Sequence, residues 1–330
     1  MTNKKSNYNS VLNNVLKKIY EIIKKNIIFI ALVLLIVLFG LTSPVFFTLS
    51  NSINLIIQTA VVSITACGMT ISIIGGSIDL SIGSIYALAG MITALTIRAT
   101  GNWVVGVIAG LCFGIFAGAI NAFLSTKAKM PSFLATLATM WIFRGIAMTI
   151  TETRDVLIPY KMYWHAFGDG YLFGKIPSQL IWVIVIALIS SFLLKSTVLG
   201  KSIFAVGENI RAARFCGIST VKVKFYVLMI CGFCAALSGI IISSQMHAAR
   251  PLSGSGMELY AIAASILGGT SLHGGRGTIS GAIWGSFIIA VLNNGLLLLG
   301  FNVYVQMIIT GLIVIVAVVL NFWRKGMVEA

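Results

Sequence analysis

Two short motifs and the three histidines of this chain contain residue types that carry out chemistry elsewhere, and each fails on spacing or surroundings. The GKS sequence at 200–202 lacks the glycine that a phosphate-binding loop needs five positions before its second glycine, because Lys195 stands there. The CGFC sequence at 231–234 has redox spacing, but it lies in apolar sequence without the positive charge or helix start that makes a thiol reactive. The three histidines have no ligand spacing. We therefore expect no nucleotide site, metal or cofactor, and no catalytic residues.

Three ionisable residues inside apolar sequence are stronger candidates for function. Asp79 lies in GGSIDLSIGS, Glu258 starts an apolar segment, and Arg144 lies within another. A charged side chain at the centre of a bilayer costs about 2.5–3.5 kcal/mol on insertion scales, so each needs polar partners. For Asp79 these are the glycine-rich backbone and the hydroxyls of Ser81 and Ser84. A plain helix N-cap is the alternative interpretation.

The composition defines the elements that hold these residues. Of the 330 residues, 58% are hydrophobic and 9% charged, and the mean hydropathy is +1.01. This excludes soluble enzymes, nucleic-acid-binding proteins and disordered chains, which need far more polar surface. No charged residue occurs in 26–78 or 277–323, and each run is long enough for two spans of about 20 residues. Weak period-2 alternation favours helices over a barrel. The sequence predicts an all-α polytopic membrane protein.

Ten transmembrane helices are expected, the eighth being short for a full span. They are predicted at 26–47, 53–74, 78–98, 103–125, 131–150, 179–195, 221–246, 258–270, 277–299 and 303–323. Most of the 23 lysines and arginines then fall on one side, which the positive-inside rule makes cytoplasmic. Both termini are expected in the cytoplasm. The net charge of +15 is explained by this topology rather than by nucleic-acid binding.

The predicted organisation is one transmembrane domain, 26–323, between cytoplasmic tails at 1–25 and 324–330. Residues 11–25 form an amphipathic helix on the membrane surface or a plain basic flank. The first apolar run is longer than a signal-peptide core and is expected to stay as a helix. The loop at 151–178 is placed outside. The basic loop at 196–220 is placed inside. It is expected to contain a short helix at 208–217, stopped by Gly217, that docks a soluble partner or lies on lipid headgroups.

Glycine patterns predict close helix packing. Small residues four apart let helix backbones approach each other, and two such rows occur, at Gly106, Gly110, Gly114 and Gly118 and at Gly277, Gly281 and Gly285. Segments 64–77 and 261–271 both end in Gly-Gly before a hydroxyl residue. This similarity indicates an internal repeat, as transporters often have, or a coincidence of low complexity.

Four motifs in order resemble one known family. They are GGSIDLSIGS (75–84), PSFLATLATM (131–140), GENIRAARFCGI (207–218) and ILGGTSLHGGRGTISGAIWGSFIIAVLNNGLLLLG (266–300). They resemble the ribose-type sugar permeases of ABC importers, in the branched-chain amino acid/ribose permease family, from about residue 53 to the C-terminus. The chain departs from the family's pattern at Ser77, where Gly is usual, and at Tyr260, where Asp is usual.

The resemblance implies a permease without its own ATPase. Two copies or two paralogues would form the path in a bacterial inner membrane. A cytoplasmic sugar-type ATPase would drive it, and an extracytoplasmic binding protein would deliver a small sugar. The family's ATPase-coupling residues map onto Gly207, Glu208, Asn209, Arg211, Ala212, Ala213, Arg214 and Gly217.

A sugar path requires hydroxyl and amide groups that bind weakly. The candidates are Asp79, Ser81, Ser84, Thr136, Thr139, Asn293 and Asn294. For each Ser or Thr, a bond to its own helix carbonyl is the alternative. Other functions stay open: an ABC permease for a nucleoside or amino acid, a passive channel, and a proton-coupled carrier. The carrier is disfavoured because it needs more intramembrane carboxylates or histidines.

Overall fold

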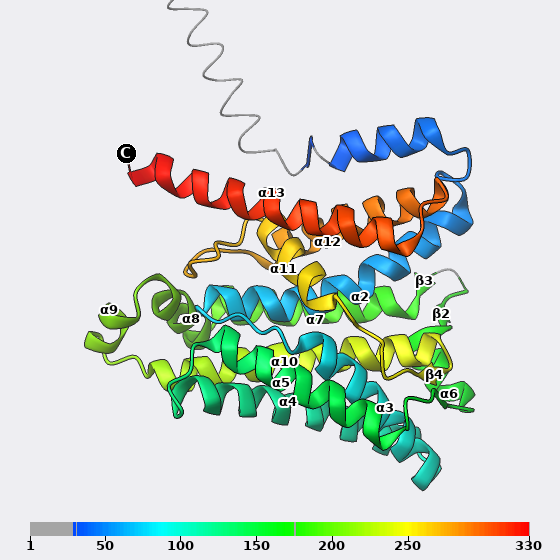
Figure 1. Ribbon diagram of the computed structural model, residues 1–330, viewed down its shortest axis with the longest axis horizontal. Helices are drawn as coiled ribbons and strands as arrows, with labels where there is room; N and C mark the ends of the chain where they lie inside the picture. Colours follow the sequence, from blue (N-terminus) through cyan, green and yellow to red (C-terminus); the bar gives the residue numbers. More distant parts are fainter. Residues whose placement is uncertain (1–28, 31, 175, 330) are drawn as a thin grey trace, which may run out of the picture.

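The computed structural model describes residues 29–30, 32–174 and 176–329, and the helices of this part lie side by side across Figure 1. The predicted tail at 1–25 lies outside these residues. The helices are α2 (Leu49–Ile74), α3 (Ile82–Thr100), α4 (Trp103–Thr126), α5 (Ser132–Ile150), α6 (Lys161–Tyr163), η1 (Trp164–Gly168), α7 (Ser178–Ser196), α8 (Val198–Glu208), α9 (Ile210–Phe215), α10 (Thr220–Gln245), α11 (Met257–Leu267), α12 (Ile279–Leu298) and α13 (Val303–Glu329). Four two-residue strands, β1 (Val156–Leu157), β2 (Tyr171–Leu172), β3 (Ile176–Pro177) and β4 (Ala248–Ala249), pair as β1–β4 and β2–β3.

Within the described residues, seven helices are long and apolar enough to cross a membrane: α2, α3, α4, α5, α7, α10 and α12. Three further apolar helical stretches are shorter, at Leu32–Thr42, Met257–Leu267 and Val303–Val316. The polytopic helical class is therefore confirmed, whereas the count of ten is not. The eighth predicted span is α11, whose 11 residues are about 16 Å long and cannot cross a core about 30 Å thick.

The third predicted span begins later than expected, because residues 75–81 are not helical. Helix α2 ends at Ile74, and Gly76 has a φ of +73°, which favours glycine. The chain then runs through a non-helical segment of turns and irregular backbone before α3 begins at Ile82. Asp79 therefore lies in this segment, before the first turn of the helix. The Gly75-Gly76 pair ends helix α2. The predicted start at 78 was too early because the apolar pattern of the sequence does not show that a non-helical segment lies inside the bundle.

The two Gly-Gly segments have matching helix ends. At the end of α2, the Ser77 amide donates to the Ser72 carbonyl, and at the end of α11 the Thr270 amide donates to the Ser265 carbonyl. The second glycine of each pair, Gly76 or Gly269, has positive φ. This common local geometry supports the internal-repeat interpretation for these two segments.

The glycine row of α4 lies against backbones of α3 and α10. A Cβ atom added at Gly106 would lie 2.8 Å from the Thr93 carbonyl oxygen of α3, and one at Gly118 would overlap the Leu228 carbonyl oxygen of α10. In the other row, a Cβ atom at Gly285 of α12 would overlap the Ala264 carbonyl oxygen of α11. Rigid backbone atoms cannot move aside singly, so larger residues at these positions separate whole helices.

Replacing Gly118 with valine is therefore expected to lower the free energy of unfolding by about 2 kcal/mol or more, at the upper end of overpacking effects. Thermal unfolding of the purified chain in detergent measures this loss. Gly311→Val in α13 is the matched control, because a Cβ atom there meets nothing within 4 Å. Equal unfolding temperatures for both variants would contradict the close α4–α10 contact.

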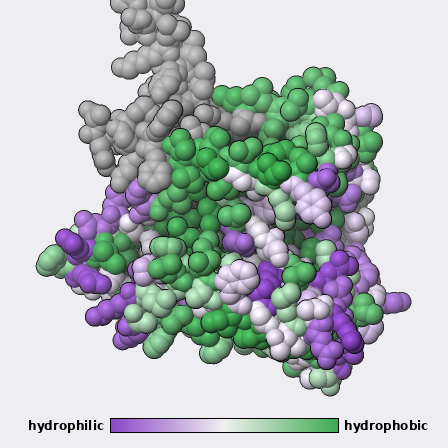
Figure 2. All heavy atoms as spheres, in the orientation of Figure 1, coloured by the Kyte–Doolittle hydropathy of each residue, from purple (hydrophilic) through white to green (hydrophobic). Residues whose placement is uncertain are grey.

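The two ends of the helical bundle differ in charge. The coupling end, defined as the end with α8 and α9, carries one acidic residue, Glu208, within 120–280, and many basic residues: Lys127, Lys129, Lys195, Lys201, Arg211, Arg214, Lys222, Lys224 and Arg276. The strand end, defined as the end with β1–β4, has mixed charge and contains the Arg250–Asp155 ion pair at 3.1 Å and a His247–Asp169 contact. Figure 2 shows hydrophilic surface at both ends and mostly hydrophobic surface between them. This pattern suits a bundle that crosses a bilayer.

The 151–178 loop is folded onto the strand end. Strand β1 pairs with β4 in the register Val156↔Ala249, and Tyr163 is fully buried, with its hydroxyl donating to the Ile240 carbonyl. Gln179 also bonds the Gly168 carbonyl of η1. The loop therefore covers the end of α10.

Candidate functional site

Asp79 is the centre of a buried polar network formed by three segments. Its side chain is 0% exposed, and its Oδ1 accepts from the Ser81 amide at 2.9 Å and from the Ser81 hydroxyl at 2.6 Å. Asn121 Nδ2 of α4 donates to Asp79 Oδ2 at 3.2 Å and to Ser81 Oγ at 2.7 Å. Thr139 of α5 donates to Asn121 Oδ1 at 2.6 Å. The network ties the 75–81 segment to α4 and α5.

Helix α5 also supplies bonds that the non-helical backbone lacks. The Leu80 amide donates to Thr136 Oγ1 at 3.0 Å, and that hydroxyl lies 3.2 Å from the Ile78 carbonyl oxygen. The Ile78 amide lies 3.4 Å from Ser132 Oγ. Non-helical backbone at membrane depth needs such partners, because lipid provides none. The PSFLATLAT sequence at 131–139 thus presents hydroxyls to the 78–80 backbone.

The remaining path candidates lie elsewhere. The side-chain amides of Asn294 in α12 and Asn51 in α2 form two hydrogen bonds with each other, at 2.9 and 3.0 Å, and both residues are buried. Asn293 Oδ1 and Ser84 Oγ are buried and have no hydrogen-bond partner among the described residues. The structure thus brings Asp79, Ser81, Thr136 and Thr139 together and separates them from the asparagine pair.

In this conformation the side chains of Asp79, Ser81, Thr136 and Thr139 are buried inside the protein. Each is at most 2% exposed, so a solute reaches them only after a rearrangement. Their role in a path stays a prediction. Sequence reasoning missed Asn121, the residue that joins the network, because one amide in the glycine-rich α4 carries no local signal of a partner in a distant segment.

The predicted coupling residues lie on two helices rather than on one helix at 208–217. Helix α8 ends at Glu208, and Asn209 starts α9 by accepting at Oδ1 from the Arg211 and Ala212 amides, both at 3.0 Å. The backbone turns at Asn209 because its side chain caps the new helix. Gly217 has a φ of +78° and follows the end of α9, in agreement with its predicted role as a helix stop.

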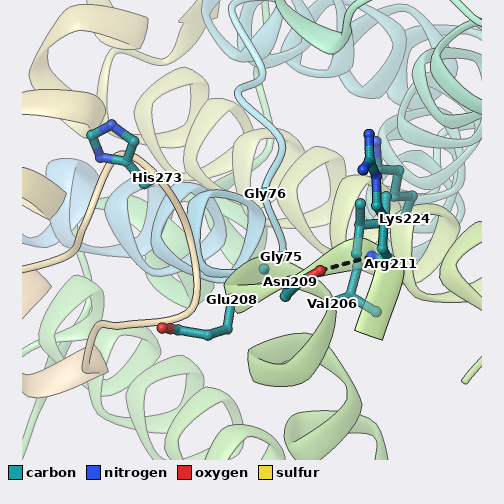
Figure 3. Close-up of a pocket in the computed structure, with 10 residues that line it drawn as sticks. Gly75, Gly76, Val206, Glu208, Asn209, Arg211, Lys224 and His273 are labelled. Carbon is teal, nitrogen blue, oxygen red and sulfur yellow. Dashed lines mark hydrogen bonds between the residues drawn. The ribbon is translucent and has the colours of Figure 1, made fainter. Parts of the chain in front are cut away.

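Four of the predicted coupling residues border a cavity of about 520 Å³ at the coupling end: Gly207, Glu208, Asn209 and Arg211. Its wall includes the α2 end at Gly75 and Gly76, the α8–α9 junction, and Lys224 of α10. Figure 3 shows Glu208 extending toward the loop that carries His273, with Arg211 and Lys224 on the other side. Glu208 pairs with Arg276 at 3.7 Å, and both side chains are exposed.

Gly207 is the tightest contact in this region. A Cβ atom there would overlap the Ile74 carbonyl oxygen, and the same carbonyl accepts from the Gly275 amide at 2.9 Å. The end of α2, the end of α8 and the 268–278 loop therefore meet at one point. A displacement of α8 is transmitted directly to α2 and to that loop.

The surface of α9 is exposed, and sequence reasoning missed its most exposed apolar residue. Phe215 is 94% exposed, Arg211 and Arg214 are exposed, and Ala213 is buried against the bundle. Phe215 lies inside the 207–218 motif, and this position is the sequence signal that could have identified it as a coupling residue. An exposed aromatic ring beside arginines is typical of the energetically important centre of a protein interface.

Comparison with known proteins finds relatives over most of the chain. Residues 51–318 match the family described as branched-chain amino acid transport system / permease component. The chain is 39% identical to the ribose import permease protein of Escherichia coli over 298 residues, covering 88% of this chain and 92% of the relative.

Two other relatives transport different sugars by name. The D-allose transport system permease protein of Escherichia coli is 37% identical over 298 residues, covering 89% of this chain and 90% of the relative. The L-arabinose transport system permease protein of the same organism is 33% identical over 282 residues, covering 86% and 85%. No solved structure matches the chain. The chain belongs to the branched-chain amino acid transport system / permease component family, and it is a transport subunit rather than an enzyme.

Proposed function

We propose that this chain is the membrane-spanning permease of an ATP-driven importer for a monosaccharide, located in a bacterial inner membrane. It works with a second permease copy or a paralogue, a cytoplasmic sugar-type ATPase and an extracytoplasmic binding protein. The names of the ribose, D-allose and L-arabinose relatives support the sugar class. The excess of positive charge supports a cytoplasmic coupling end.

The α8–α9 junction is the observation that carries the proposal. The junction is exposed and cationic, and Asn209 caps the start of α9. It lines the same cavity as the end of α2 and Lys224 of α10. An ATPase bound there moves α8 when it closes on ATP. Because Gly207 touches the α2 backbone, this motion reaches the bundle as a rigid-body shift.

The double variant Glu208→Ala, Arg211→Ala is expected to reduce ATP-dependent sugar uptake about tenfold and to retain less ATPase on the purified permease, since interface charges are lost. The measurement is uptake of radiolabelled D-ribose by vesicles that contain the complete importer, together with the amount of ATPase that co-purifies.

Two controls separate docking from internal structure. Arg276→Ala breaks the ion pair within this chain but leaves both docking residues in place, and Lys161→Ala removes a cation at the strand end. Both should keep near-normal uptake. Normal uptake by the double variant, or an equal loss in Arg276→Ala, would remove the docking assignment.

A further inference from the structure

Two non-helical segments enter the helical bundle from opposite ends and meet inside it. Segment 75–81 leads from the coupling end to α3, and segment 250–256 leads from the strand end to α11. Both traces are visible in the middle of Figure 1. At the meeting point a Cβ atom at Gly83 would overlap the Gly254 carbonyl oxygen and would lie 2.5 Å from Glu258 Oε2. The first turns of α3 and α11 are therefore in contact away from both ends.

Arg144 of α5 holds this junction. Its Nη1 donates to the Pro251 and Ser253 carbonyls at 2.7 and 2.8 Å. Its Nη2 donates to the Gly83 carbonyl at 3.1 Å. A guanidinium has five N–H donors, so two are left over after these three bonds among the described residues. The Glu258 carboxylate lies at the same glycine, because its Oε2 is one of the two atoms that a Cβ atom at Gly83 would meet within 2.5 Å.

This charged pair lies next to an uncovered face of the protein. Arg144 and Glu258 are half-buried. On the same stretch of α5, Trp141 is 70% exposed, and a Cβ atom at Gly145 would meet nothing within 4 Å. In Figure 2 a small hydrophilic area interrupts the hydrophobic surface near its middle, where α5 and the start of α11 lie. Charges at membrane depth are costly against lipid and instead face protein or a water-filled space.

The chemistry of these groups selects a class of ligand. A guanidinium with free donors and a carboxylate with acceptor oxygens can both bond hydroxyl groups, and an exposed indole ring packs against the C–H face of a sugar ring. The two opposite charges cancel, so the pair selects for neither a cationic nor an anionic solute. A neutral solute with many hydroxyls satisfies both.

We infer that Arg144, Glu258 and Trp141 form a site inside the membrane that binds a neutral polyhydroxylated solute during its passage. This inference rests on the proposed function and deepens it. In this inference the solute contacts the half-buried Arg144 and Glu258, and it does not contact the buried Asp79 network. Gly145 adds open space on the same helix, because a Cβ atom there would meet nothing within 4 Å.

The test uses the complete importer in vesicles and counts D-ribose molecules transported per ATP hydrolysed at saturating D-ribose. Glu258→Gln and Trp141→Ala are expected to lower this ratio about tenfold, the effect of losing one strong contact in passage. Gly145→Leu should lower it similarly by filling the space. The matched controls are Ile142→Ala, at an exposed neighbouring position, and Gly311→Leu, at another glycine with open space.

Thermal unfolding and the retained ATPase are measured on every variant. A structural role alone would lower stability or assembly but leave the D-ribose to ATP ratio of the assembled importer unchanged. An unchanged ratio in Glu258→Gln and Trp141→Ala, or equal losses in the two controls, would overturn the site. Absence of ATP-dependent uptake of D-ribose, D-allose and L-arabinose by the wild-type importer would instead overturn the proposed sugar function, and this site with it.

Discussion

Replacing Asp79 with leucine is expected to prevent folded protein from accumulating in the membrane. The substitution removes the acceptor of the Ser81 amide, the Ser81 hydroxyl and one Asn121 hydrogen bond, all fully buried. A buried polar group left without a partner costs about 1–3 kcal/mol. Several such groups together give a loss of at least ~3 kcal/mol, a large share of a typical net stability.

The expected result is measured as the amount of monodisperse protein after detergent extraction and as its unfolding temperature. Asp79→Asn is expected to be intermediate, because an amide oxygen still accepts from Ser81 and the Asn121 amide can reverse its orientation. Ser84→Ala is the control: its hydroxyl is equally buried but has no partner among the described residues, so its removal leaves no group unsatisfied. If Asp79→Leu were as stable as Ser84→Ala, the network would not hold the 75–81 segment.

Replacing Gly207 with valine is expected to reduce ATP-dependent uptake to background. The new side chain overlaps the Ile74 carbonyl and crowds the Gly275 amide at 2.6 Å, and both neighbours are backbone. Helix α8 must therefore move away from α2, and the bond between Gly275 and Ile74 is lost with it. ATP hydrolysis then no longer moves the bundle, since the rigid contact between α8 and α2 is gone.

Uptake and ATP hydrolysis by the reconstituted importer are measured together for this variant. ATP hydrolysis should persist in the bound ATPase while uptake disappears. Ser202→Val places the same side chain on α8 at a half-buried position whose hydroxyl bonds only within its own helix, and it should behave nearly as wild type. Coupled uptake in Gly207→Val would show that the contact between α8 and α2 does not transmit the motion.

The seven long spans were predictable, because transfer of an apolar segment into lipid depends on the composition of that segment alone. The predicted start of the span at 78 was wrong by four residues, and the predicted docking helix at 208–217 is split at Asn209. Both errors have one cause. The side chains of Asp79 and Asn209 accept hydrogen bonds from nearby backbone amides and so compete with helical backbone hydrogen bonds. Hydropathy contains no information about these side-chain hydrogen bonds.

The sequence alone determined the membrane class, the positions of most spans, the close-packing glycines and the motifs of the coupling end. These are properties of short segments, because hydropathy, charge and the small size of glycine each act locally. Only the tertiary structure decided that Asp79 is enclosed with Asn121, and that Arg144 bonds carbonyls more than 100 residues away. Polar groups in an apolar medium take whatever partner the packing of helices brings near, and that choice is made by the whole bundle.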